Sequence, residues 1–279
     1  MIPKSRLYTL VKSWKNKPFQ AVHDAGSTTL GSGLNDPVRL EAEALWSKRQ
    51  SISYEPIFNH SGSKLCGVLF QPLLQAADPQ VLRLFMDGLD AIQYWQSLSK
   101  PIPTILPITA KTLCEPNQVD AISDLVLNSR LPVGLVALGI INLPSAQFWS
   151  DYQIGLARLR RIGLMLHLLH FSGSQQELQH IDEMRFDGVH LSAQQLRTDQ
   201  VEQQATLQQS ISALSAICQK NYGAIYISGI SLISDLTTAQ SYAARYCYGG
   251  LMMPPVSRHQ LLQINDSRLA KAIFSVKPQ

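Results

Sequence analysis

Two histidines and no carboxylate lie in the stretch LMLHLLHFSGS, Leu164 to Ser174, where an apolar run ends in a glycine-containing loop. Imidazoles bind zinc and similar ions, and they exchange protons near neutral pH. We expect His170 and His190 near the ends of neighbouring strands, with His167 close by. A zinc site normally has three or four protein ligands, and the sequence offers no evident third ligand. We therefore expect half-buried histidines bonded to the backbone or to water, and no metal or other cofactor.

Carboxylates are missing where a metal-dependent hydrolase would need them. Such an enzyme holds hard cations with several Asp or Glu oxygens, and in an α/β barrel these stand at the carboxyl ends of the strands. Segments 131–150 and 162–176 contain no acidic residue, and Asp187 stands at the amino end of its apolar run. Glu55 is the one carboxylate in the interior of a predicted strand. One acid cannot hold a two-metal centre, so the sequence predicts a protein that is not an enzyme.

The elements that must position these residues alternate between apolar runs and amphipathic stretches. Short apolar runs are typical of strands buried on both faces, and the stretches between them, such as 78–98 and 205–221, have helical periodicity. Eight such runs separated mostly by helices predict an α/β fold, a TIM-like (β/α)8 barrel. The runs are 52–58, 64–70, 103–109, 133–140, 163–169, 186–192, 222–229 and 247–253.

The connection between the first two runs predicts one irregularity in this barrel. Residues 59–63, NHSGS, are too few for the helical crossover that parallel strands require. We therefore expect an antiparallel hairpin, and a first strand that is antiparallel to its neighbour.

Length and composition fit one barrel domain. The chain has 279 residues, of which 45% are hydrophobic, enough to bury a large core. Its four cysteines are far apart and form no CxxC pair, which favours reduced thiols over a zinc ribbon. No apolar run reaches the length of a transmembrane helix, and the first residues lack the apolar core of a signal peptide. These features predict a cytoplasmic protein.

Positive charge is concentrated at the amino terminus. Residues 1–20 contain five basic residues and no acidic one, whereas the whole chain has a net charge of +4. The remainder is close to neutral and offers no broad basic field for nucleic acid. We predict a basic extension and flexible linker over residues 1–35, followed by a barrel domain over residues 36–279. Residues 1–20 either form an amphipathic helix packed on the domain or dock on a partner or an anionic membrane.

Four segments, in the right order and spacing, resemble the EAL domain, the cyclic-di-GMP phosphodiesterase module of bacterial signalling. ISYEPIFNHSG resembles the family's opening strand and hairpin, and CGVLFQPLLQ stands where the signature Glu-Ala-Leu strand belongs. LLHFSGSQQELQHIDEMRFDGVHLS matches, without gaps, the stretch from Asp-Asp-Phe-Gly to Lys-Ile-Asp. IYISGISLISDLTTAQSYAARYCYGGLMMPP resembles the stretch from Ala-Glu-Gly-Val-Glu to Gln-Gly-Tyr. The resemblance covers most of residues 38–265 and implies an EAL-type barrel.

The departures from the family fall on the residues that carry its chemistry. The signature glutamate corresponds to Leu69 or, with a two-residue slip, to Gln71, and the paired aspartates correspond to Leu169 and His170. The family's metal-binding Asn and Glu of the third and fourth strands have no counterpart in TILPIT and VALGI. The resemblance therefore implies the fold, while these substitutions predict that the hydrolase chemistry is lost.

The remaining family positions are also changed. Lysine and aspartate of Lys-Ile-Asp become His190 and Ser192, and the two glutamates of Ala-Glu-Gly-Val-Glu become Ser228 and Ser231. Tyr248 stands for the glutamine of Gln-Gly-Tyr, and an acid replaces the family's guanine-contacting glutamine. Matched to the family site, the candidate ligand-binding positions are Glu55, Gln71, His170, His190, Ser192, Ser228 and Tyr248.

Three functions follow as alternatives. The first is a catalytically inactive EAL-like regulator of motility, adhesion or biofilm, which binds a protein partner through its outer helices or residues 1–20. Glutamine-rich stretches at 175–179 and 200–209 would let such a surface dock at low charge-desolvation cost. The second is a cyclic-di-GMP receptor without hydrolysis, which is disfavoured because an ionised Glu55 would repel phosphate. The third, an active phosphodiesterase, would need ligands on loops that the sequence does not reveal.

Overall fold

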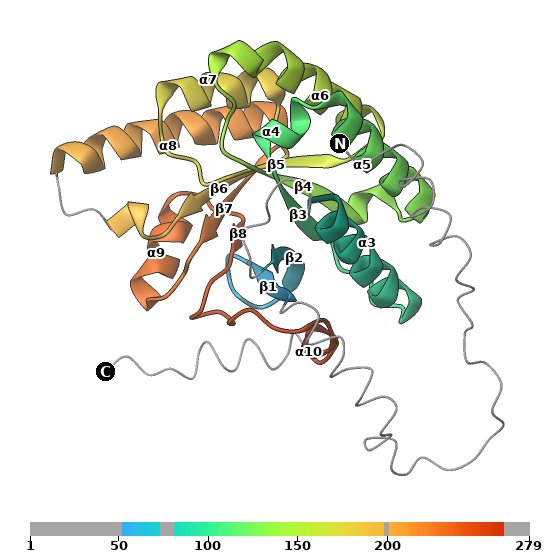
Figure 1. The fold of residues 1–279 in the computed structure, drawn as a ribbon. Helices are drawn as coiled ribbons and strands as arrows, with labels where there is room; N and C mark the ends of the chain where they lie inside the picture. The colour runs from blue at the N-terminus through green and yellow to red at the C-terminus, as the bar shows by residue number, and fades with distance from the viewer. Residues whose placement is uncertain (1–51, 73–80, 198–200, 265–279) are drawn as a thin grey trace, which may run out of the picture. The chain divides into compact units, whose positions relative to one another are not determined.

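The computed structural model describes residues 52–72, 81–197 and 201–264, and all of them belong to the unit Ser51–Gln279 (Figure 1). The predicted extension and linker, residues 1–35, lie outside the described residues, as does the predicted domain start at residue 36. Those two predictions therefore remain predictions.

Eight strands form a closed barrel in which each strand pairs with the next along the chain and the last pairs with the first. This confirms the predicted α/β barrel. Each of the eight apolar runs overlaps one strand, because a strand inside a barrel is covered on both faces and needs apolar residues on both. The strands are β1 Ile52–Asn59, β2 Leu65–Pro72, β3 Thr104–Thr109, β4 Val136–Ile141, β5 Met165–Leu169, β6 Gly188–Ser192, β7 Ala224–Ser228 and β8 Tyr246–Cys247.

The predicted irregularity at the start of the barrel is confirmed. β1 is antiparallel to both of its neighbours, β2 and β8, whereas all other pairs are parallel. The hairpin turn is closed by the Asn59 side chain, whose Oδ1 accepts hydrogen bonds from the backbone of Ser63 at 2.9 Å and Lys64 at 3.1 Å. Gly62 lies in the turn at a φ of 67°, a conformation that glycine adopts without steric cost.

The prediction for the last strand was wrong in its extent. The apolar run 247–253 predicted a long strand, but β8 contains only Tyr246 and Cys247. Beyond it the chain turns closely around Ile230, whose N–H donates to the Tyr248 carbonyl at 3.1 Å. Gly249 makes this approach feasible, because a Cβ at its φ of 147° would lie 2.2 Å from the Ile230 nitrogen.

The helices lie outside the ring of strands, and α3 to α9 are spread around it in Figure 1. Capping residues fix several starts: the Ser174 hydroxyl accepts from the Glu177 N–H, and Pro116 opens another helix. No helix in the described part of the chain is both long and apolar enough to cross a membrane. The helices are α3 Val81–Ser97, α4 Ala110–Leu113, α5 Pro116–Ser129, α6 Trp149–Arg161, α7 Gln175–Met184, α8 Val201–Asn221, α9 Ile233–Ser241 and α10 Arg258–Leu262.

Two separate apolar clusters hold the barrel together. The larger one lies between strands and helices, where for example Tyr54 of β1 meets Trp95 of α3 edge to face, with ring centroids 5.0 Å apart. The smaller one consists of the buried residues Ile57, Leu69, Ile105, Ala137, Leu169 and Tyr248. These come from strands all around the ring, so the smaller cluster fills the barrel interior, as packed side-chain layers do in barrels of this class.

Candidate functional site at the mouth of the barrel

The carboxyl ends of the parallel strands meet at one end of the barrel, which we call the mouth. Side chains two residues apart on a strand point to the same face. Since Ile57 and Leu69 belong to the interior cluster, Glu55 and Gln71 also point into the barrel. Gln71 stands near the carboxyl end of β2, and Glu55 lies beside it because β1 runs in the opposite direction. The structure therefore places these two predicted site residues together, at the mouth.

Glu55 is a buried carboxyl group in neutral surroundings. Its side chain is 9% exposed, and its Oε2 accepts a hydrogen bond from the Gln71 side-chain amide. Burial raises the pKa of Glu55 from 4.5 to about 7. A carboxyl group that is half-ionised at neutral pH is able to exchange a proton or to accept hydrogen bonds from a ligand.

A chain of three hydrogen-bonded rings crosses the interior below the mouth. His167 Nδ1 lies 3.0 Å from His190 Nε2, and His190 Nδ1 lies 2.7 Å from the Tyr248 hydroxyl. Burial lowers the pKa of His167 to about 4. Burial also lowers the pKa of His190, and the nearby His167 and His170 add to that shift. Both imidazoles are therefore neutral at physiological pH, and each can donate from one nitrogen while accepting at the other.

The structure places His170 directly after β5 and His190 on the neighbouring strand β6, as expected, but the predicted half-burial is wrong for both. His190 is 1% exposed and bonds to His167, whereas His170 is exposed and follows β5 with a φ of 60°. That left-handed conformation at the strand end turns the chain into the loop before α7. Within residues 52–72, 81–197 and 201–264, no three His, Cys, Asp or Glu side chains gather closely enough to hold a metal ion.

Aromatic rings continue the hydrogen-bonded chain toward the other end of the barrel. The Tyr226 ring stacks on His190 with centroids 4.4 Å apart, and Tyr246 stacks on Tyr226 at 4.6 Å. Gly188 leaves room for these rings, because a Cβ there would lie 2.4 Å from His167 Nδ1. The sequence predicts His167 close to His170 and His190 but indicates no role for it or for Tyr226. The alternation of side chains along β5 and β7 is the signal that would have placed both residues inside the barrel.

The serines of the candidate site make local backbone contacts. The Ser228 hydroxyl donates to the Leu191 carbonyl at 3.0 Å, and the Ser192 hydroxyl accepts from the Gln194 N–H at 3.2 Å. Both residues are half-buried at the ends of adjacent strands, paired in register. They provide weak hydrogen-bonding groups at the mouth and no charge.

An ion pair that the sequence analysis missed lies after these strands. The Arg197 guanidinium bonds both carboxylate oxygens of Asp235, and it also donates to the Ser231 hydroxyl at 2.7 Å. Burial opposes ionisation of Asp235, but this guanidinium and the N–H groups of Ser231 and Leu232 outweigh burial and lower its pKa. Asp235 neutralises the charge of Arg197, and its bonds to the Ser231 and Leu232 N–H groups hold the start of α9.

The residues at the mouth do not suit the pair of divalent cations that an EAL-type hydrolase uses. Hard cations need several oxygen ligands with negative charge. The inward side chains are Leu69 and Gln71 on β2, Leu169 on β5 and His190 on β6. His190 is neutral, and both of its ring nitrogens are hydrogen-bonded. Glu55, on β1, is a single carboxyl group and is bonded to Gln71. We therefore derive no reaction step through a metal at this mouth.

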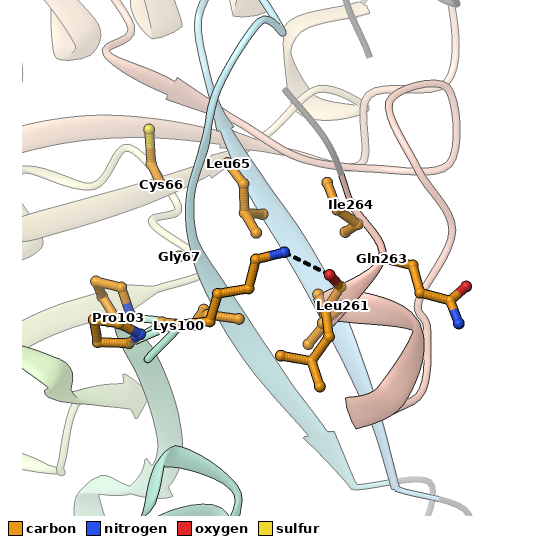
Figure 2. Close-up of a pocket in the computed structure, with 11 residues that line it drawn as sticks. Leu65, Cys66, Gly67, Lys100, Pro103, Leu261, Gln263 and Ile264 are labelled. Carbon is orange, nitrogen blue, oxygen red and sulfur yellow. Dashed lines mark hydrogen bonds between the residues drawn. The ribbon is translucent and has the colours of Figure 1, made fainter. Parts of the chain in front are cut away.

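A cavity of about 560 Å³ lies at the opposite end of the barrel, at the amino ends of β2 and β3 (Figure 2). Leu65, Pro103 and Leu261 contribute apolar walls. Lys100 is its charged side chain, and the ammonium group already donates to the Leu262 carbonyl. The sequence does not predict this cavity. None of the residues that line it belongs to the candidate site at the mouth.

Comparison with solved structures finds EAL domains. The EAL domain of Mycobacterium smegmatis DcpA is similar with a TM-score of 0.65 and 13% identity over 79% of this chain and 97% of that chain. An EAL domain protein from Listeria monocytogenes EGD-e gives 0.63 and 15% over 80% and 96%. The Xanthomonas citri FimX EAL domain, solved in complex with c-diGMP, gives 0.62 and 13% over 78% and 92%.

These similarities establish the fold as the EAL type of (β/α)8 barrel, with its antiparallel first strand. No model of a known protein family matches the sequence, and a comparison with curated protein sequences gives no match. At identities of 13–15% the similarity speaks for the fold and not for the chemistry.

Proposed function

We propose that this chain is a non-hydrolytic EAL-type barrel that regulates by binding a protein partner, within bacterial cyclic-di-GMP signalling. One observation carries the proposal: Glu55 is the one acid found among the inward side chains near the mouth in the described residues, and Leu69, Gln71, Leu169 and His190 supply no anionic oxygen. The signalling context is supported by the fold shared with EAL domains, one of which is solved with c-diGMP.

The outer face of α7 and α8 suits a protein partner. These helices pack against each other, and Lys220 of α8 forms an ion pair with Asp182 of α7 at 2.8 Å. Uncharged amides dominate the solvent side, so a partner would bury it without stripping water from many charges. The exposed glutamines are Gln175, Gln176 and Gln179 on α7 and Gln208, Gln209 and Gln219 on α8.

A photo-crosslinking experiment tests this face. A photoreactive phenylalanine analogue is introduced at Gln179 or Gln209 of the full chain, expressed in the source cells, with exposed Ala157 of α6 as the matched control position. We expect one discrete protein adduct from the glutamine positions and none from Ala157. Equal labelling from all three positions, or no adduct from either glutamine, would contradict the proposed face.

A non-hydrolytic receptor for cyclic-di-GMP is the second candidate, and the complex of the Xanthomonas citri FimX domain with c-diGMP is what favours it. The mouth of this barrel offers little to a phosphodiester, because Arg197 is bonded to Asp235 and both interior histidines are neutral. Isothermal titration with cyclic-di-GMP in EDTA separates the candidates. Absence of heat supports the protein-binding regulator, and saturable binding would make the receptor the better description.

A further inference from the structure

Glu55 has an oxygen that is still available to a ligand. Gln71 donates to Oε2, and within the described residues no hydrogen-bond partner of Oε1 is found. Buried polar groups are almost always hydrogen-bonded, and a buried carboxylate without a cation is strongly disfavoured. No cation offsets the burial of Glu55, and its Oε1 is not among the fully buried, unpartnered atoms of the described residues, which leaves that oxygen accessible to a ligand.

The surroundings of Glu55 contain hydrogen-bonding groups and an aromatic ring but no cation. On β2 it is paired with Leu69 and accepts a hydrogen bond from Gln71, and its negative charge adds to the effect of burial in raising the phenol pKa of Tyr248, just after β8. On β6, His190 is neutral, and on β7, Ser228 carries no charge. The guanidinium of Arg197, which follows β6, is paired with Asp235.

A carboxylate with an accessible oxygen and no cation of its own is the chemistry that recognises organic cations. Carboxylate oxygens accept strong, charge-assisted hydrogen bonds from guanidinium and ammonium groups. From this geometry we propose that the mouth of the barrel is a binding site for a guanidinium or alkylammonium group, with the Glu55 carboxylate as its counter-ion. This site goes beyond the proposed function, which does not depend on it.

Binding at this site is coupled to loss of a proton. A cation pairs with the ionised carboxylate, and burial raises the Glu55 pKa to about 7, so the free site is largely protonated at pH 6 and largely ionised at pH 8. The apparent affinity for a cation should therefore increase about tenfold from pH 6 to pH 8.

The test uses the full chain with methylguanidinium as the probe and its neutral analogue N-methylurea as the control. The side-chain carboxyl carbon of Glu55 is followed by NMR in protein labelled with ¹³C-glutamate, and affinity is measured by titration calorimetry at pH 6 and pH 8. We expect a saturable shift of the Glu55 carbon with methylguanidinium and none with N-methylurea. Loss of the calorimetric signal is expected in Glu55→Gln and not in Glu183→Gln, which changes an exposed acid on α7.

The site would be refuted by an unmoved Glu55 carbon, by an equal response to N-methylurea, or by unchanged binding in Glu55→Gln. An arginine tripeptide with blocked ends identifies the source of the cation. Tighter binding of the tripeptide than of methylguanidinium assigns the site to a basic segment of a protein, and weaker binding assigns it to a small free ligand. Metal-dependent cleavage of cyclic-di-GMP would overturn the proposed function independently of either result.

Discussion

The Tyr248 hydroxyl lies 2.7 Å from Nδ1 of His190, so a residue just after β8 is hydrogen-bonded to β6 across the interior of the barrel. The same imidazole bonds to His167 on β5 through its other nitrogen. Three strands are thereby joined by side chains in a region where an EAL-type hydrolase would need charged ligands. This part of the interior is a hydrogen-bonded cluster in which both imidazoles are neutral.

Replacement of Tyr248 by phenylalanine removes one member of this chain. The buried His190 Nδ1 loses its partner, and an unsatisfied buried group costs about 1–3 kcal/mol. We expect Tyr248→Phe to lower the free energy of unfolding by that amount in urea at pH 7. Tyr222→Phe is the control, because Tyr222 is 96% exposed, and it should leave stability unchanged. Equal stability of both variants would show that the hydroxyl contributes nothing.

Addition of one methyl group at Gly188 should disrupt the same chain. A Cβ there would lie 2.4 Å from His167 Nδ1 and 2.8 Å from the Tyr226 ring, and both rings are confined inside the barrel. Overpacking of this kind costs about 1–3 kcal/mol. We expect Gly188→Ala to lower the thermal midpoint clearly, whereas Gly250→Ala, with nothing within 4 Å, should not. A Gly188→Ala variant as stable as the parent would contradict the packing described.

Burial of Glu55 makes the free energy of unfolding decrease as pH rises from about 4.5 to 7. Its pKa is about 7 in the folded state and 4.5 in the unfolded state, where the group is in water. Folding is therefore accompanied by proton uptake at pH values between 4.5 and 7. Stability is lost as pH rises from about 4.5 to 7, and the full penalty of roughly 3 kcal/mol remains above pH 7. We expect Glu55→Gln to be more stable than the parent at pH 8, with the difference vanishing near pH 4. Urea unfolding across this range measures it, and a difference independent of pH would contradict it.

His167 acts in the opposite direction, in acid. Its folded-state pKa of about 4 lies below the ordinary value of 6.5, so the folded state favours the neutral ring. Below pH 6.5 the unfolded state binds a proton that the folded state does not. The free energy of unfolding therefore decreases as pH falls from 6.5 toward 4, by up to about 1.4 kcal/mol per pH unit. His167→Gln should flatten this acid limb, and His60→Gln, at an exposed turn position, should not. An unchanged limb in His167→Gln would mean that His167 titrates normally.

The barrel could be predicted because its strands are coded locally. Each apolar run marks a strand, and the five-residue connection NHSGS alone requires the antiparallel hairpin. The extent of β8 could not be read in the same way. The apolar residues 248–253 continue the pattern, but the close backbone approach of Gly249 to Ile230 is a tertiary contact that ends the strand.

The site was predictable in its residue types and not in its contacts. The presence of Glu55 as the one acid inside a predicted strand is plain in the sequence, whereas the partner of His190 depends on register between strands. His167 pairs with Gly188, which brings the two rings together diagonally, and His170 follows the strand end in a left-handed conformation, with a φ of 60°. The Arg197–Asp235 pair joins residues 38 positions apart and has no local signature.

The central claim is that this EAL-type barrel does not cleave cyclic-di-GMP, and a hydrolysis assay tests it most directly. The full chain is incubated with cyclic-di-GMP and Mg²⁺ or Mn²⁺, with EDTA as the control, and cyclic and linear dinucleotides are separated and quantified. We predict that the dinucleotide stays cyclic at the rate of the EDTA control. Metal-dependent appearance of the linear product, in proportion to protein concentration, would contradict the claim.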